Sequence, residues 1–139
     1  MLDLNAYRPE AFADRPVRQA LMDGWKGKCP NCHHGKMFHS YLKVEPECMV
    51  CGEELHHQRA DDGPAYLTIL VCGHVIAPLI HLVFVWFRPD PLALGVSFAL
   101  LFIAMALYLL PRFKGGMIAL QWARRMHGFG HEAHQESAP

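Results

Sequence analysis

Four cysteines in two pairs carry the clearest chemistry in this sequence. Cys29 and Cys32 enclose two residues, and fifteen residues later Cys48 and Cys51 do the same. A gap of two residues lets both thiolates of a pair face one ion, and two such pairs have the spacing of a zinc ribbon. Because four thiolates close a tetrahedral site, the pattern predicts a structural rather than a catalytic metal.

Zinc is the metal that we expect at these cysteines, although two alternatives use the same residues. Iron in a rubredoxin-like site has the same four-thiolate geometry. Disulfides would also use these cysteines, but the membrane orientation argued below places them in a reducing compartment. Residues 26–60 contain few apolar side chains, so metal binding is expected to supply most of the free energy that folds this small β domain.

A second set of ionisable side chains lies just after the ribbon. It comprises His56, His57, Arg59, Asp61 and Asp62. Imidazoles and carboxylates together indicate either a second metal site or a proton relay. The alternative, which we favour, is the charged start of a helix that lies among lipid headgroups and against the surface of a partner protein.

Two further histidines lie inside an apolar segment. His74 and His81 are seven residues apart, which places them on one face of a helix and about 10 Å apart along its axis. An ionisable side chain inside a membrane span is a candidate functional residue. One ion cannot bridge that distance, so haem or copper binding would need ligands from a second copy of the chain or from a partner protein. The alternative is a pair of neutral, hydrogen-bonded histidines.

A short chain must position all of these residues. It has 139 residues with 13 Lys+Arg and 13 Asp+Glu, which excludes a two-domain enzyme and provides no overall charge for binding nucleic acid. In a lipid-modifying enzyme, His56, Asp61 and Asp62 would be the acid and base. The sequence shows no nucleophile, phosphate loop or open metal triad beside them, so we expect a protein that is not an enzyme.

Much of the remaining chain is apolar. Residues 65–87 and 91–110 contain no Asp, Glu, Lys or Arg, and each is long enough to cross about 30 Å of hydrocarbon as a helix. Only three residues separate them, so residues 61–111 are predicted to form an antiparallel transmembrane hairpin. Pairs of small residues predict the seam between the two helices, namely Gly73 with Ala77 and Gly95 with Ala99.

The charges and flanking segments predict how this hairpin lies in a membrane. Eight Lys or Arg precede the first span, four follow the second and one lies in the turn, so both termini should face the cytoplasm from an inner or plasma membrane. In the N-terminal segment, residues 1–25, a short amphipathic helix is expected from residue 16. Residues 112–129 should form another on the lipid surface, with Trp122 at headgroup depth. Residues 130–139 are expected to be a disordered tail.

Longer motifs resemble a known family. They are C-P-N-C, F-H-S-Y-L-K-V, H-H-Q-R-A-D-D-G-P-A-Y, G-H-V-I-A-P and L-L-P-R-F-K-G-G, within residues 20–129. On these motifs the chain resembles the small bacterial membrane proteins of domain-of-unknown-function family 983. The resemblance implies a cytoplasmic zinc ribbon followed by two membrane helices. It also implies that, in alphaproteobacteria, genes of this family tend to lie beside the genes for haem-copper cytochrome c oxidase and its assembly factors. His33 departs from the pattern, because such ribbons usually have glycine after the second cysteine, where it eases a left-handed turn. Histidine tolerates this conformation better than most residues, so a left-handed backbone is still expected at His33.

The expected fold class is therefore a mainly α membrane protein with a two-helix transmembrane hairpin, an N-terminal zinc ribbon and short interfacial helices. Its expected function is that of an accessory subunit or assembly factor of a respiratory complex, in the first place cytochrome c oxidase. Partner contact is expected through His74 and the stretch from Arg59 to Tyr66. The alternative is a protein that holds copper or haem through His74 and His81, with a partner or as a dimer.

Overall fold

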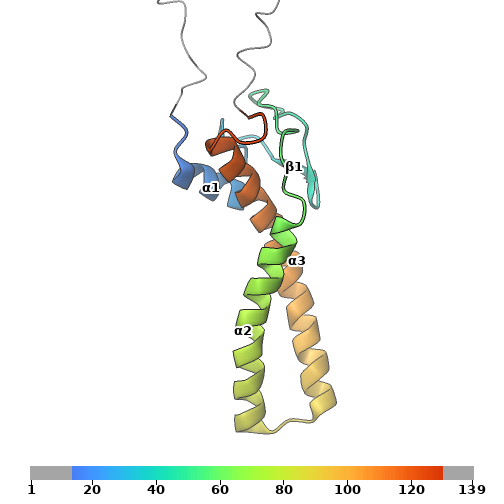
Figure 1. The fold of residues 1–139 in the computed structure, drawn as a ribbon. Helices are drawn as coiled ribbons and strands as arrows, with labels where there is room; N and C mark the ends of the chain where they lie inside the picture. The colour runs from blue at the N-terminus through green and yellow to red at the C-terminus, as the bar shows by residue number, and fades with distance from the viewer. Residues whose placement is uncertain (1–13, 130–139) are drawn as a thin grey trace, which may run out of the picture.

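Two long apolar helices dominate the computed structural model, which describes residues 14–129. They are α2 (Gly63–Phe87) and α3 (Pro91–Ala123), and both are long and apolar enough to cross a membrane. Figure 1 shows them as a hairpin that projects from a small unit containing the other elements. These elements are α1 (Val17–Trp25), β1 (Phe38–Ser40) and β2 (Lys43–Val44). The prediction of a mainly α fold with an apolar hairpin and a small β element is confirmed.

Local sequence explains where the hairpin turns. Asp90 is the N-cap of α3, and its carboxylate accepts hydrogen bonds from the amides of Leu92 and Ala93 at 3.1 Å each. Pro91 follows at the first helical position, where a missing N–H costs nothing. At the start of α2, Asp62 occupies the N-cap position without a side-chain hydrogen bond, and Pro64 lies in the first turn.

The seam of the hairpin differs from the one predicted. On α2 the buried residues are Pro64, Thr68 and Cys72. A Cβ atom added to Gly73 or to Gly95 would meet nothing within 4 Å, so these glycines lie away from the neighbouring helix. The predicted small-residue seam is therefore wrong. Gly73 and Ala77 are exposed on the side of α2 away from α3, and Figure 1 shows that α2 and α3 also diverge toward their connecting turn.

The second long helix does not end where the sequence predicted. We expected a break at Pro111 and a separate surface helix over residues 112–129, but α3 continues through Pro111 to Ala123. A helix of 33 residues is about 50 Å long, well beyond the roughly 30 Å of a hydrocarbon core. Its last turns therefore belong to the small unit and not to the hairpin.

That small unit, which we call the head domain, is formed by residues 14–62 together with the end of α3 and the residues up to 129. Its core takes side chains from α1, from the ribbon and from α3, namely Ala20, Met37, Leu55, Ala60, Ile118, Ala119, Trp122, Ala123 and Phe129. Trp122 is only 5% exposed, and its Nε1 donates to a carboxylate oxygen of Glu53 at 2.9 Å. The prediction that Trp122 lies at headgroup depth is wrong, because the ribbon covers this side chain.

The ribbon is attached to α3 by hydrogen bonds at the turn of its β-hairpin. Strands β1 and β2 pair antiparallel, with Phe38 opposite Val44 and Ser40 opposite Lys43. At the turn between them, the hydroxyl of Tyr41 donates to the carbonyl of Leu107 at 2.8 Å. The ammonium of Lys114 donates to the carbonyl of Leu42 at 2.7 Å. The ribbon therefore has a defined position on the long helix.

Candidate metal centre

The four predicted cysteines come together at one point of the head domain. All four sulfur atoms lie within 4.8 Å of one another, and Cys29–Cys51 and Cys32–Cys48 are each separated by 3.7 Å. Four ligands at about 2.3 Å from a central ion in tetrahedral geometry are about 3.8 Å apart. A disulfide bond is about 2.05 Å long, so these are free thiols. The cluster therefore fits a single tetrahedral ion such as Zn²⁺.

Each cysteine pair forms the same tight turn. The carbonyl of Cys29 accepts from the amide of His33, and that of Cys48 from the amide of Gly52, both at 2.9 Å. The residue after each second cysteine is left-handed, with φ of 64° at His33 and 75° at Gly52. The sequence thus predicted the backbone at His33 correctly. This histidine also forms an ion pair through Nδ1 with Asp23 of α1, a contact that glycine would not provide.

The thiols differ in their acidity. Burial raises the pKa of Cys29 and of Cys51 above the ordinary thiol value. Burial acts in the same direction on Cys32, but hydrogen bonds from the backbone amides of Gly35 and His34 outweigh it and lower the pKa of Cys32 to about 7. A metal must therefore displace protons from Cys29 and Cys51 at neutral pH, so metal affinity should increase with pH.

Gly35 is required by the metal centre itself. Its amide donates to the sulfur of Cys32 at 3.3 Å, and a Cβ atom at this position would overlap the sulfur of Cys48. We therefore predict that Gly35→Ala pushes one ligand out of place and lowers zinc affinity by at least about 10-fold, the size of effect seen when groups around metal ligands are changed. Competition with a chromophoric chelator measures this affinity.

Gly52→Asn is the matched control for Gly35→Ala. Nothing lies within 4 Å of a Cβ atom at Gly52, and asparagine tolerates its left-handed backbone. This variant should bind zinc like the original chain. Equal zinc affinity in Gly35→Ala would contradict the proposed role of Gly35.

The second predicted set of ionisable residues is divided by the structure. The carboxylate of Glu54 joins the imidazoles of His56 and His57, and one ligand atom of each lies within 4.8 Å of the others. Asp61 and Asp62 are exposed and do not take part in this group. The structure therefore does not form the mixed cluster of histidines with Asp61 and Asp62 that was considered beside the favoured charged helix start, because Glu54 and not an aspartate joins the two histidines.

Arg59 has a structural role through its backbone. The side chain of Gln121, nearly buried in α3, accepts from the amide of Arg59 at 2.9 Å and donates to its carbonyl at 3.0 Å. Next to this contact, Ala60 enters the core and Gly63 lies so close to Met117 that a Cβ atom would overlap its side chain. The chain just before α2 is therefore bonded to α3 through the side chain of Gln121.

We predict that Gln121→Ala destabilises the head domain by about 1–3 kcal/mol, because it leaves two backbone groups of Arg59 without partners in a partly buried position. Gln19→Ala is the control, since Gln19 lies on the exposed side of α1. Thermal unfolding of the detergent-purified chain measures the difference. A melting temperature that is unchanged by Gln121→Ala would show that the contact contributes nothing.

Tyr66, His74 and His81 lie on the side of α2 that points away from α3. At 100° per residue they are roughly opposite the buried Thr68 and Cys72. All three are exposed, and Nδ1 of His74 donates to the carbonyl of Leu70 at 2.7 Å. Within residues 14–129 neither histidine belongs to a group that could hold a metal ion. The structure thus places them on one face, as predicted, without forming a haem or copper site.

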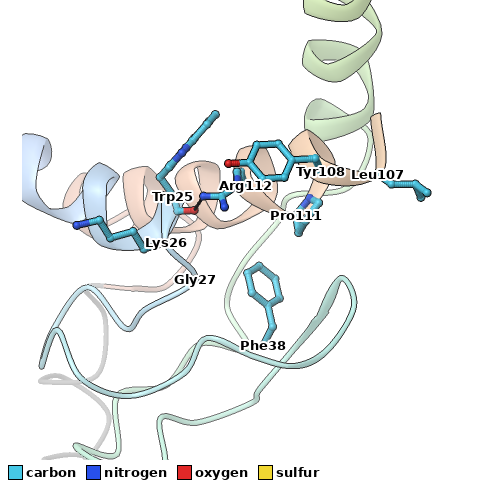
Figure 2. A pocket seen from close by; sticks show the side chains of 8 residues that line it. All are labelled: Trp25, Lys26, Gly27, Phe38, Leu107, Tyr108, Pro111 and Arg112. Atoms are coloured by element: carbon cyan, nitrogen blue, oxygen red, sulfur yellow. Dashed lines mark hydrogen bonds between the residues drawn. The ribbon is translucent and has the colours of Figure 1, made fainter. Parts of the chain in front are cut away.

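A cleft of about 330 Å³, which was not predicted from the sequence, lies where α3 passes from the hairpin into the head domain. Figure 2 shows the side chain of Arg112 between the rings of Trp25 and Tyr108. Its guanidinium lies 4.2 Å from the centroid of the Tyr108 ring and 5.9 Å from that of Trp25. No carboxylate of the described chain pairs with Arg112 or with Lys26, the other cation of the cleft. The cleft between the hairpin and the head domain is therefore lined by cationic and aromatic side chains.

Several residues that shape the head domain were missed by the sequence analysis. They are Gly24, Gly35, Glu54, Gly115 and Gln121. The adjacent glycines at 115 and 116 were the one available signal, because glycine inside a helical segment indicates a close approach of another backbone. The remaining residues are placed by contacts between distant parts of the chain.

Comparison with known proteins relates this fold to one family. A family model described as "Protein of unknown function (DUF983)" matches residues 38–122, more than half of the chain. The matched region begins in the β-hairpin and includes Cys48, Cys51 and the two long helices as far as Trp122. No curated protein and no solved structure matches the chain.

Proposed function

Starting from the fact that the chain belongs to the DUF983 family, we propose that it is a membrane-anchored zinc-ribbon protein that docks on an integral membrane protein complex and is not itself an enzyme. In this proposal α2 and α3 span the bacterial inner membrane and the head domain lies in the cytoplasm. The docked complex is a respiratory one, with haem-copper cytochrome c oxidase as the expected partner. The role is that of an accessory subunit or an assembly factor.

The outward face of α2 is the observation that carries this proposal. Only 11% of the most apolar stretch of α2, and none of that of α3, is buried within the chain, so other molecules must cover the hairpin. Lipid tails suit most of this surface but not the imidazoles of His74 and His81, because a ring nitrogen without a hydrogen-bond partner costs free energy in hydrocarbon, and the bond to Leu70 uses only one of the two ring nitrogens of His74. Gly73 and Ala77 lie beside them and let another helix approach closely.

The orientation rests on the junction between hairpin and head domain. Lys26 and Arg112 line the cleft there, and the apolar side chains of Leu21, Met22 and Trp25 are exposed nearby on α1. Cations favour the cytoplasmic side of a membrane, and aromatic rings favour the headgroup level. Arg59, Asp61 and Asp62 are exposed above α2 and would extend the docking surface into the cytoplasm.

Site-specific photocrosslinking in intact cells tests the proposal. A photoreactive residue at Ala77 should crosslink to a subunit of the oxidase, and His74→Leu should reduce that product. The control is the same probe at Leu100, which is 63% exposed on α3 and should face lipid. Crosslinks to a second copy of this chain, or equal products at both positions, would contradict the proposal.

A further inference from the structure

Outside the cysteine cluster, three ligand-type side chains meet on the surface of the ribbon. One carboxylate oxygen of Glu54 lies 3.0 Å from Nε2 of His57 and 3.6 Å from Nε2 of His56. The two imidazole rings are adjacent, with centroids 4.1 Å apart. Three potential ligand atoms therefore converge on one point without any thiol among them.

The separations of these atoms suit a metal ion. Nitrogen and oxygen ligands lie about 2.1 Å from a divalent transition metal. Two ligands at that distance are about 3.0 Å apart when they subtend 90° at the ion, and about 3.6 Å apart when they subtend close to 120°. The observed distances of 3.0 and 3.6 Å match these two values. Since all three ligand atoms also lie within 4.8 Å of one another, one ion can bind the three side chains after small side-chain movements.

The backbone holds the three side chains in place. Both Leu55 and His56 donate their amides to the carbonyl of Pro46, at 2.8 and 3.1 Å, and the side chain of Leu55 is fully buried. On the other side, the ring of Phe129 packs edge-on against His57 with centroids 5.7 Å apart. The ligand set is thus pre-organised, which reduces the entropy cost of binding an ion.

We propose that Glu54, His56 and His57 bind a divalent transition-metal ion as a second, exchangeable metal site of this chain. Imidazole and carboxylate ligands select borderline ions such as Zn²⁺, Ni²⁺, Co²⁺ or Cu²⁺ and not Ca²⁺ or Mg²⁺. Three protein ligands leave at least one coordination position for water or for a ligand from another molecule. The side chain of His56 is about half exposed, so this position is open to solvent, unlike the closed four-cysteine site.

Cobalt titration of the detergent-purified full chain, loaded with one equivalent of zinc so that only the closed four-cysteine site is filled, tests this site. A background of His131→Ala and His134→Ala removes two further histidines of the sequence from the measurement. We expect one additional Co²⁺ per chain with weak d–d absorption. Thiolate-to-cobalt charge transfer should be absent, since the cysteines keep their zinc. His56→Ala should weaken this Co²⁺ affinity on the order of 100-fold, and Glu54→Gln should weaken it as well.

His39→Ala is the matched control. His39 lies 3.8 Å from the carboxylate of Glu45 but, within residues 14–129, belongs to no group of three metal-ligating side chains, so its loss should leave Co²⁺ binding unchanged. Zinc content in each variant verifies that the ribbon is still folded. Binding that is unaffected by both His56→Ala and Glu54→Gln, or no Co²⁺ beyond the ribbon metal, would overturn the proposal.

Discussion

Cys29→Ser will release the metal and unfold the ribbon, whereas the same change at Cys72 will leave both intact. Each of the two cysteines is fully buried, so burial alone does not distinguish them. Cys29 is one of four thiols around the candidate ion, and Cys72 lies on α2 in the seam of the hairpin. Serine is a poor ligand for Zn²⁺, so the tetrahedral set loses a member only in the first variant.

The size of this effect follows from how little else stabilises the ribbon. Its longest strand has three residues, and from residues 26–60 the shared apolar core contains three buried side chains, Met37, Leu55 and Ala60, with Phe38 and Val44 packed at its edge. A structural zinc site contributes on the order of 10 kcal/mol or more, which exceeds the net stability of most small domains. Without the ion, the small apolar contact with α3 and the few hydrogen bonds beside it are expected to supply too little free energy to keep residues 26–60 folded.

Elemental analysis and limited proteolysis together measure this prediction. Purified Cys72→Ser should contain one zinc per chain and resist cleavage between residues 26 and 60. Cys29→Ser should contain none and be cleaved there, while the apolar hairpin stays protected by detergent. A protected ribbon without metal would show that packing, and not the ion, stabilises it.

Gly115→Ala will destabilise the head domain, and Gly116→Ala will not. At Gly115 the backbones of α1 and α3 meet, because a Cβ atom on either Gly24 or Gly115 would overlap the backbone of the other. A methyl group at this crossing must push the helices apart, and overpacking of this kind costs about 1–3 kcal/mol, offset by about 1 kcal/mol of improved helix propensity. Ala119 is also close to Gly24, so no nearby space can absorb the movement.

The adjacent glycine, Gly116, provides a matched control for Gly115→Ala. A Cβ atom on Gly116 meets nothing within 4 Å, so Gly116→Ala keeps the gain in helix propensity without the clash and should stabilise α3 by up to about 1 kcal/mol. The two variants are therefore expected to shift the melting temperature in opposite directions. Protease cleavage after residues of α1 should increase only in Gly115→Ala. Stabilisation by both substitutions would contradict the close helix crossing.

This crossing matters for the proposed function because α3 connects the hairpin to the ribbon. Above the crossing, the guanidinium of Arg15 lies 4.4 Å from the centroid of the Trp122 ring and donates to the carbonyls of Trp122 and Phe129. One uninterrupted helix, α3, thus contributes both to the apolar hairpin and to the core of the head domain. We therefore expect the ribbon to keep a fixed orientation relative to the hairpin.

Features that depend on residues close together in the sequence could be predicted from the sequence. Spacing alone identified Cys29, Cys32, Cys48 and Cys51, because the geometry of a cysteine knuckle is set within a few residues. The absence of charge over residues 65–87 and 91–110 identified the two long helices, since length and composition decide whether a helix can cross hydrocarbon. The left-handed backbone at His33 followed from its place in the knuckle.

Only the tertiary structure decided what each apolar or ionisable side chain contacts. An apolar pattern predicts that Trp122 is covered but not whether lipid or protein covers it. Gly24 and Gly115 are 91 positions apart, and their contact depends on how α1 crosses α3. Likewise Glu54, and not Asp61 or Asp62, joins the two histidines, because the bonds of Leu55 and His56 to Pro46 fold the chain back there. The hydrophobic effect favours burial of an apolar side chain whatever residue covers it, so the sequence does not specify which residue lies across each contact. Packing in three dimensions decides that.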